Sequence, residues 1–159
     1  MAKRHPLRNR PRIDPAPIDG SLSITALVDN TFLAYKDMGI RIGDCDNGAC
    51  NQLSNITIAN NIIKGTQGLI FYYASGTVTN FTVRNNLYFN AGSAAYSGGY
   101  NYDAAPITGD PRITDPKALP VTSLAVNMGW PVNGIDLDYY QNARVIGGSP
   151  DIGAIEYKP

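Results

Sequence analysis

The sequence is poor in the residues that build most metal centres and acid–base sites. Among 159 residues it has one histidine, His5, and two cysteines, Cys45 and Cys50. A structural zinc site needs four Cys or His ligands, so we expect no zinc. Charged residues make up 16% of the chain, and thirteen basic side chains balance thirteen acidic ones. A chain without net charge is not expected to bind nucleic acid or an anionic membrane.

Long hydrophobic runs are also missing. No apolar stretch approaches the roughly 20 residues of a transmembrane helix. The basic opening (MAKRHPLRNRPR) is followed by no hydrophobic stretch, so we expect no signal peptide within this sequence. Cys45 and Cys50 flank Asn47-Gly48 closely enough to close a small disulfide loop, although two free thiols remain the alternative. A disulfide is typical of an oxidising compartment, so we predict a secreted or periplasmic protein whose signal peptide was removed or is encoded upstream.

What the chain does have is a repeated phrase. Residues 55–63 read NITIANNII, and residues 80–88, 25 positions later, read NFTVRNNLY. Residues 24–32 (ITALVDNTF) keep the same pattern. Each copy is a short alternating strand, an Asx-Asn pair and a second apolar strand. A repeat of about 25 to 31 residues with strand chemistry in every copy predicts a β-solenoid, in which successive coils stack.

The repeats divide the chain into three parts. Residues 1–20 are rich in proline and arginine and predict a flexible arm. Residues 21–105 hold the predicted coils and show no helical periodicity. Residues 106–159 are expected to wrap back along the coils, because five prolines between positions 106 and 131 interrupt regular strand pairing. We expect Trp130, Ile152 and Ile155 to be at least partly buried there.

Within each copy, alternation assigns side chains to two faces. The inward positions are predicted to be Thr25, Leu27, Ile56, Ile58, Phe81 and Val83. The outward positions are predicted to be Thr57, Ala59, Thr82 and Arg84. Asparagine tolerates the left-handed backbone of a sharp corner, and stacked asparagines can hydrogen-bond from coil to coil. Asn30, Asn61 and Asn86 are therefore predicted to form a structural ladder and not a ligand site.

Three phrases of the tail strengthen this interpretation. They are residues 109–116 (GDPRITDP), 123–129 (SLAVNMG) and 151–157 (DIGAIEY). Together with the repeats, they resemble the last coils and tail of right-handed parallel β-helix proteins of the pectate-lyase-like superfamily, as in the alginate lyase and chondroitinase B group. The resemblance covers roughly residues 21–157 and implies an all-β fold of about three coils plus a C-terminal wrapping segment. It also implies that Arg144 ties down the tail by pairing with Asp151 or Glu156.

The same resemblance implies a carbohydrate-active protein, similar to polysaccharide lyases, that acts on or binds an acidic polysaccharide such as alginate. Catalytic members of the superfamily usually have ten or more coils, whereas this sequence holds about three. It therefore resembles the C-terminal piece of a longer lyase-like protein, or a truncated relative, and in either case the residues that carry the chemistry need not lie in this sequence. The alternative is a non-catalytic β-helix module for glycan binding, capping or assembly.

Candidate chemistry follows from β-elimination of a uronate, which needs a base and a cation near the carboxylate. The cationic candidates on the coils are Lys36, Arg41, Lys64 and Arg84. Ordinary solvated side chains are the competing interpretation. Tyr72, Tyr73 and Tyr88 could stack on sugar rings or fill the core. Asp44 and Asp46, in the spacing D-x-D-N-G, resemble the start of a calcium loop whose remainder is missing.

The first coil has an exposed end. The apolar residues Leu22, Ile24 and Leu27 and a layer of strand edges lie there, while residues 1–20 have too little apolar content to cover them. We therefore expect a second copy of the chain, or upstream coils of a longer protein, to cover this end.

Overall fold

The described part of the protein is all-β. The computed structural model describes residues 21–22, 25–33, 40–41, 52–65, 71–72, 78–91, 103–115 and 117–159. These residues form strands, turns and irregular segments, with no helix among them. Correspondingly, the described ranges contain no helix long and apolar enough to cross a membrane. The all-β part of the predicted fold class is confirmed.

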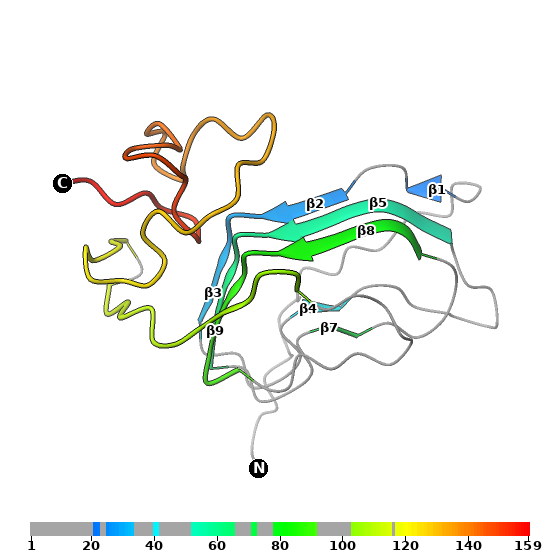
Figure 1. Ribbon diagram of the computed structural model, residues 1–159, viewed down its shortest axis with the longest axis horizontal. Helices are drawn as coiled ribbons and strands as arrows, with labels where there is room; N and C mark the ends of the chain where they lie inside the picture. Colours follow the sequence, from blue (N-terminus) through cyan, green and yellow to red (C-terminus); the bar gives the residue numbers. More distant parts are fainter. Residues whose placement is uncertain are drawn as a thin grey trace, which may run out of the picture.

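The strands pair in parallel and fall into three sheets. The first sheet contains β1 (Ser21–Leu22), β2 (Thr25–Val28), β5 (Gln52–Ala59) and β8 (Val78–Arg84). The second contains β3 (Thr31–Leu33), β6 (Ile62–Lys64), β9 (Leu87–Phe89) and β10 (Ile107–Thr108). The third pairs β4 (Ile40–Arg41) with β7 (Phe71–Tyr72). In Figure 1, β2, β5 and β8 lie side by side, and after each of these strands the chain bends into β3, β6 or β9, respectively.

The repeated phrases lie in register with one another. We call β2–β3, β5–β6 and β8–β9 the first, second and third repeats. In the first sheet, Leu27 lies beside Ile58, which lies beside Val83. After the corner, Phe32 lies beside Ile63, which lies beside Tyr88. Equivalent residues are therefore neighbours, because the alternation and the Asx-Asn pair recur at the same positions in every repeat.

Two apolar clusters pack on either side of the second sheet. One consists of Ile56, Ile58, Ile63, Val83 and Tyr88, which point to the inside of the repeats. The other joins Ile62 and Leu87 to the tail residues Leu119, Ala125 and Ile152. Adjacent residues such as Ile62 and Ile63 point to opposite faces of a strand, so β6 and β9 are buried on both sides. Complete burial of a side chain of this size contributes about 1.5–3 kcal/mol to stability, and the tail supplies part of that burial for both Ile62 and Leu87.

One predicted face assignment is wrong. Ala59 was expected to face solvent, but it is 0% exposed. Its neighbour across the sheet, Arg84, lies against the ring of Trp130, and the adjacent Asn60 binds the main chain of Trp130. The tail therefore covers this end of the outer face, which the alternation of one strand could not reveal. Thr57 and Thr82, farther from the corner, remain partly exposed.

Several sequence-based predictions lie outside the described residues. They concern the arm 1–20, the pair Cys45 and Cys50, the calcium candidates Asp44 and Asp46, and the side chains of Lys36 and Tyr73. For Arg41 and Tyr72 the structure describes the strands β4 and β7 but not the side chains.

Candidate functional site

The chain turns at the same Asx-Asn pair in every repeat. The first residue of each pair adopts a left-handed backbone, with φ of 59° at Asp29, 55° at Asn60 and 53° at Asn85. Asp and Asn accept this conformation more readily than other residues with a Cβ atom. The turn sends the side chain of the first residue toward the tail and that of the second residue into the repeats. The two residues of a pair therefore have different roles.

The second residues form a hydrogen-bonded ladder. Asn30 donates its backbone N–H and its Nδ2 to Oδ1 of Asn61, both at 3.1 Å. Asn61 donates the same two groups to Oδ1 of Asn86, at 3.0 and 2.8 Å. Asn61 and Asn86 are fully buried, and each also donates Nδ2 to carbonyl oxygens of its own and the preceding repeat. Such satisfied buried amides are stabilising, because an unpaired one would be costly.

The ladder ends at a residue that the sequence analysis missed. Oδ2 of Asp103 accepts the backbone N–H and Nδ2 of Asn86, at 2.9 and 2.8 Å, and also the hydroxyl of Tyr88 at 2.9 Å. Oδ1 of Asp103 accepts the N–H of Ala105. An ionised carboxylate has no donor to pass on, so Asp103 terminates the ladder.

Tyr88 therefore belongs to the interior. It is 8% exposed, and it packs in the inner apolar cluster. Burial, together with the negative charge of Asp103, raises the pKa of the Tyr88 hydroxyl above its ordinary value of 10.0. The ring does not lie on the surface, which corrects its candidacy as a platform for a sugar.

The first residues of the pairs hold the tail at three levels. Oδ1 of Asp29 accepts from the guanidinium of Arg144 at 2.8 Å. Asn60 makes two bonds to the backbone of Trp130, accepting its N–H and donating to its carbonyl oxygen, both at 2.7 Å. Nδ2 of Asn85 donates to the carbonyl oxygen of Met128 at 3.0 Å. In Figure 1, the tail, coloured yellow to red, lies outside the corner where these residues are.

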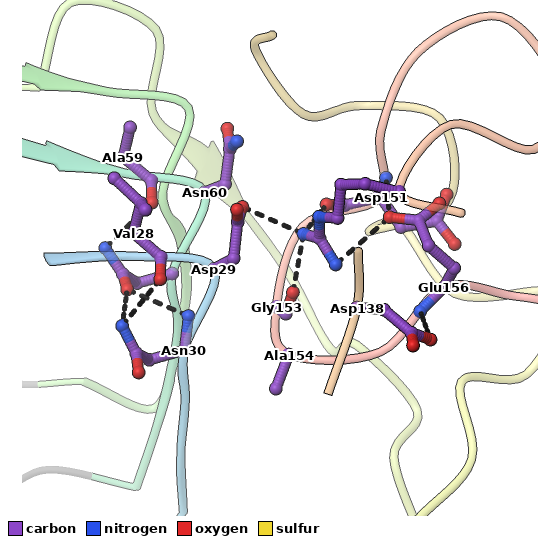
Figure 2. Close-up of polar contacts among 12 residues, drawn as sticks. Val28, Asp29, Asn30, Ala59, Asn60, Asp138, Asp151, Gly153, Ala154 and Glu156 are labelled. Atoms are coloured by element: carbon purple, nitrogen blue, oxygen red, sulfur yellow. Dashed lines mark hydrogen bonds and ion pairs between the residues drawn. The ribbon is translucent and has the colours of Figure 1, made fainter. Parts of the chain in front are cut away.

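Arg144 is the centre of a buried charged cluster. Its side chain is 3% exposed and lies between Asp29, at 2.8 Å, and Glu156, whose Oε1 is 3.1 Å from Nη1. Nη2 also donates to the carbonyl oxygens of Asp151 and Gly153, at 2.7 and 2.6 Å. Figure 2 shows Asp29 and Glu156 on opposite sides of the guanidinium. Nε of Arg144 has no hydrogen-bond partner, and Nη1 meets Glu156 without hydrogen-bond geometry.

Arg144 thus pairs with the carboxylate of Glu156, as the sequence predicts, whereas its contact with Asp151 is to the main-chain carbonyl oxygen. The carboxylate of Asp151 serves another purpose, because it accepts the backbone N–H groups of Asn127 and Tyr157. The ion pair with Asp29 joins the tail to the first repeat, and it was not predicted.

Burial dominates the electrostatics of this cluster. It raises the pKa of Glu156 from its ordinary 4.5 to about 7, and the nearby carboxylates of Asp151 and Asp138 act in the same direction. Burial also raises the pKa of Asp29, against the attraction of Arg144. For Asp138, burial likewise acts to raise the pKa, but hydrogen bonds from Asn142, Glu156 and Tyr140 hold it below the ordinary value.

The described cationic candidates contact the tail. Nζ of Lys64 donates to the carbonyl oxygen of Ile113 at 3.3 Å, lies 3.7 Å from Asp110 and sits over the ring of Phe89. In register, Lys64 lies between Leu33 of the first repeat and Phe89 of the third. Arg84 lies 4.5 Å from the centre of the Trp130 ring, and its Nε donates to Asn85. The structure does not bring Lys64 and Arg84 together, since they end strands of different sheets.

The outer face of β5 and β8 is polar and uncharged up to Arg84. Ser54 lies beside Thr79, and Thr57 beside Thr82. Between these pairs, Asn55 and Asn80 have φ of 57° and 53°, and Nδ2 of Asn80 donates to Oδ1 of Asn55 at 2.8 Å. The described members of this face are exposed or partly exposed. We call these residues and Arg84 with Trp130 the outer polar face; it presents hydroxyl and amide groups beside one cation and one aromatic ring.

Two exposed aromatic residues were also missed. Tyr139 is 73% exposed and Tyr140 is 44% exposed, and their rings meet edge to face at 5.1 Å. Buried Asp138 fixes their turn by accepting the N–H groups of Tyr140 and Asn142. The sequence signal was available, because the pair follows Asp138 in a polar turn segment. The sequence analysis considered only tyrosines within the predicted coils.

A small cavity lies between the repeats and the tail. This cavity, of about 10 Å³ between β3, β6 and the tail, is lined by Thr31, Ile62, Leu119, Ile152 and neighbouring residues, with room for about one water molecule. The same ranges contain no group of three or more His, Cys, Asp or Glu residues placed to hold a metal ion. Comparisons with protein-family models, curated proteins and solved structures found no match to the chain.

Proposed function

We propose that the protein is a right-handed parallel β-helix of the polysaccharide-lyase type, and that it binds an acidic polysaccharide such as alginate on the outer polar face. Parallel repeats in register, turning at equivalent Asx-Asn corners, support the solenoid. The three tail phrases support the superfamily. In this proposal the protein works outside the cytoplasm, where such polymers occur, and calcium at Asp44 and Asp46 remains a prediction.

The observation that carries the proposal is the composition of the outer polar face. Thr57, Thr82 and Asn80 offer neutral donors and acceptors at successive levels of the sheet, about 4.8 Å apart. Partly exposed Arg84 adds a positive charge for a uronate carboxylate, and Trp130 keeps its guanidinium in place. An extended chain of sugars fits an open, flat face better than a closed pocket.

Binding is favoured over cleavage for the described residues. Elimination requires a base that is free to take a proton, but Lys64 contacts the tail and Tyr88 is buried. Lys36 and Arg41 remain candidates for the chemistry, since their side chains lie outside the described residues. Polysaccharide lyase activity is therefore the second proposal, and a non-catalytic module is compatible with the first.

The test is binding to alginate, polygalacturonate and neutral dextran by isothermal titration calorimetry. We expect binding to the two acidic polymers that weakens with salt. Arg84→Gln should weaken binding to the acidic polymers about tenfold. The double variant Thr57→Val, Thr82→Val should weaken it about three- to tenfold, because the hydrogen bonds of the hydroxyl groups to the polymer are lost. Thr122→Val, an exposed threonine of the tail, is the matched control and should change nothing.

Equal binding of dextran, or unchanged affinity in both the Arg84 and threonine variants, would refute the outer polar face as the site. Ultraviolet absorbance of unsaturated uronate products, followed in the same mixtures, tests the second proposal separately.

A further inference from the structure

The asparagine ladder has a direction. At each level, the backbone N–H and Nδ2 of one residue donate to the side-chain oxygen of the next, from Asn30 to Asn61 to Asn86 to Asp103. Each interior amide oxygen thus receives two hydrogen bonds from the preceding repeat. Oδ1 of Asn30 receives none from any described residue. The ladder therefore begins with an open acceptor.

The surroundings of Asn30 are correspondingly less buried. Asn61 and Asn86 are 0% exposed, whereas Asn30 is partly exposed. Leu27 is partly exposed as well, although Ile58 and Val83, at the same position of the next two repeats, are 1% and 4% exposed. Within the described ranges, no strand pairs with the outer edge of β2 or β3. Among the described residues, an open acceptor, a half-buried leucine and two strand edges without a pairing strand coincide on one side of the first repeat.

We propose that this side, formed by β2, Asn30 and β3, is a docking edge for an extended segment of a separate partner chain. The segment lies parallel to β2 and β3, has the pattern strand, Asx-Asn, strand, and donates the N–H and Nδ2 of its second corner residue to Oδ1 of Asn30. One of its apolar side chains packs on Leu27. This is strand addition to a sheet edge, with the amide pair supplying specificity for asparagine.

The ladder chemistry disfavours a second copy of the chain as the occupant. In a head-to-tail arrangement, the end that would meet Asn30 presents Asp103, which has no donor to offer. That end also carries β10 and the bonds of residues 104–109 to the third repeat. In a head-to-head arrangement, two Asn30 oxygens would face each other as acceptors. A partner segment with a donor asparagine meets the edge without either conflict.

The experiment uses the full chain and two synthetic peptides. The first peptide, NITIANNIIK, copies residues 55–64, and the second replaces the residue equivalent to Asn61 by Asp. The aspartate has the same shape but lacks the Nδ2 donor, and its charge faces Oδ1 of Asn30. Binding is measured by fluorescence anisotropy of labelled peptide, and the site by amide hydrogen exchange of the protein.

We expect the asparagine peptide to bind and to slow exchange at residues 25–33, while residues 103–109, at the other end of the ladder, stay unchanged. The aspartate peptide should bind at least about tenfold more weakly. Equal affinity for the two peptides, no binding at millimolar peptide, or protection outside residues 25–33 would overturn the proposal. The proposal would also be overturned if residues 25–33 of the free protein were already as protected from exchange as residues 56–63. This holds whether light scattering shows the free protein as a monomer or as a self-associated species.

Discussion

Replacing Arg144 by methionine is expected to destabilise the docked tail strongly. Methionine keeps much of the volume of the side chain, so the change chiefly removes charge and hydrogen bonds. Arg144 is 3% exposed, and it pairs with Asp29 and Glu156 and donates to two carbonyl oxygens. Removing one partner of a buried ion pair leaves an uncompensated buried charge and typically costs about 3–5 kcal/mol. Here two carboxyl groups lose their partner, so we expect a loss within this range.

The chain offers two independent probes for this measurement. Trp130 is the only tryptophan, and it belongs to the tail, where Asn60 holds its backbone. Its fluorescence therefore reports docking of the tail, while far-ultraviolet circular dichroism reports the strands. In urea, both transitions of Arg144→Met should shift to lower concentration, and the melting temperature should fall by on the order of 10 °C. Arg144→Lys, which keeps the charge but cannot reach all four partners, should lose about half as much.

A free-energy loss under about 1 kcal/mol for Arg144→Met would refute the reasoning, because it would mean that the cluster contributes little beyond its own desolvation. A tail that detaches, by Trp130 fluorescence, while the strands keep their melting temperature would also contradict the joint packing of Ile62 and Leu87 with the tail.

Three further predictions concern the corners and the charged cluster. Asn61→Leu should cost at least about 2–4 kcal/mol in urea unfolding, because it leaves polar groups of Asn30 and of the buried Asn86 without partners. Thr57→Ala should stay within about 0.5 kcal/mol, and similar losses in the two variants would contradict the ladder. Asn60→Gly should lose the two hydrogen bonds to Trp130 but keep the left-handed turn. Asn60→Ala loses the same bonds and also strains the turn, so it should cost about 1 kcal/mol more in urea unfolding. An alanine variant as stable as the glycine variant would exclude a strained corner. The folded state raises the pKa of Glu156 from 4.5 to about 7, so the folded protein keeps a proton that the unfolded chain releases. Stability should therefore fall as pH rises between these two values, by up to about 1.4 kcal/mol per pH unit. Glu156→Gln should flatten this slope in pH-dependent melting, and an unchanged slope would assign it to another group.

The repeat was sufficient to predict the inner side of the molecule. Alternation and spacing placed Ile56 and Ile58 inward, and both are buried. The Asx-Asn pairs also indicated which residues stack, since Asn30, Asn61 and Asn86 bond in succession. These features are local and periodic, so each copy of the phrase supports the same assignment as the others.

Asp103 escaped prediction because it breaks the period. It follows Asn86 by 17 residues, whereas Asn86 follows Asn61 by 25. It also carries no Asx-Asn pair, and it follows a stretch rich in glycine and tyrosine. Chemistry gives one clue: the buried donors of Asn86 need an acceptor beyond the last repeat, and Asp103 is the first aspartate after Asn86.

The outer side depended on contacts between distant segments. Asp29 and Arg144 are 115 residues apart, and Asn60 and Trp130 are 70 apart. No pattern within one strand encodes such pairs, which is why Ala59 was assigned to solvent and the role of Asp29 was overlooked. The missing clue was that each corner has two polar residues where the ladder uses only one.

The paired corner residues connect the two halves of the structure. A corner with a single asparagine could stack its repeats and still leave the tail free. With two, the left-handed first residue aims its side chain outward, and each level then binds a different part of the tail: Arg144 at Asp29, Trp130 at Asn60 and Met128 at Asn85. Because the tail thereby spans all three repeats, it can dock fully only when they are in register. The same arrangement places Trp130 beside Arg84, so the aromatic and cationic end of the outer polar face exists only in the fully docked protein.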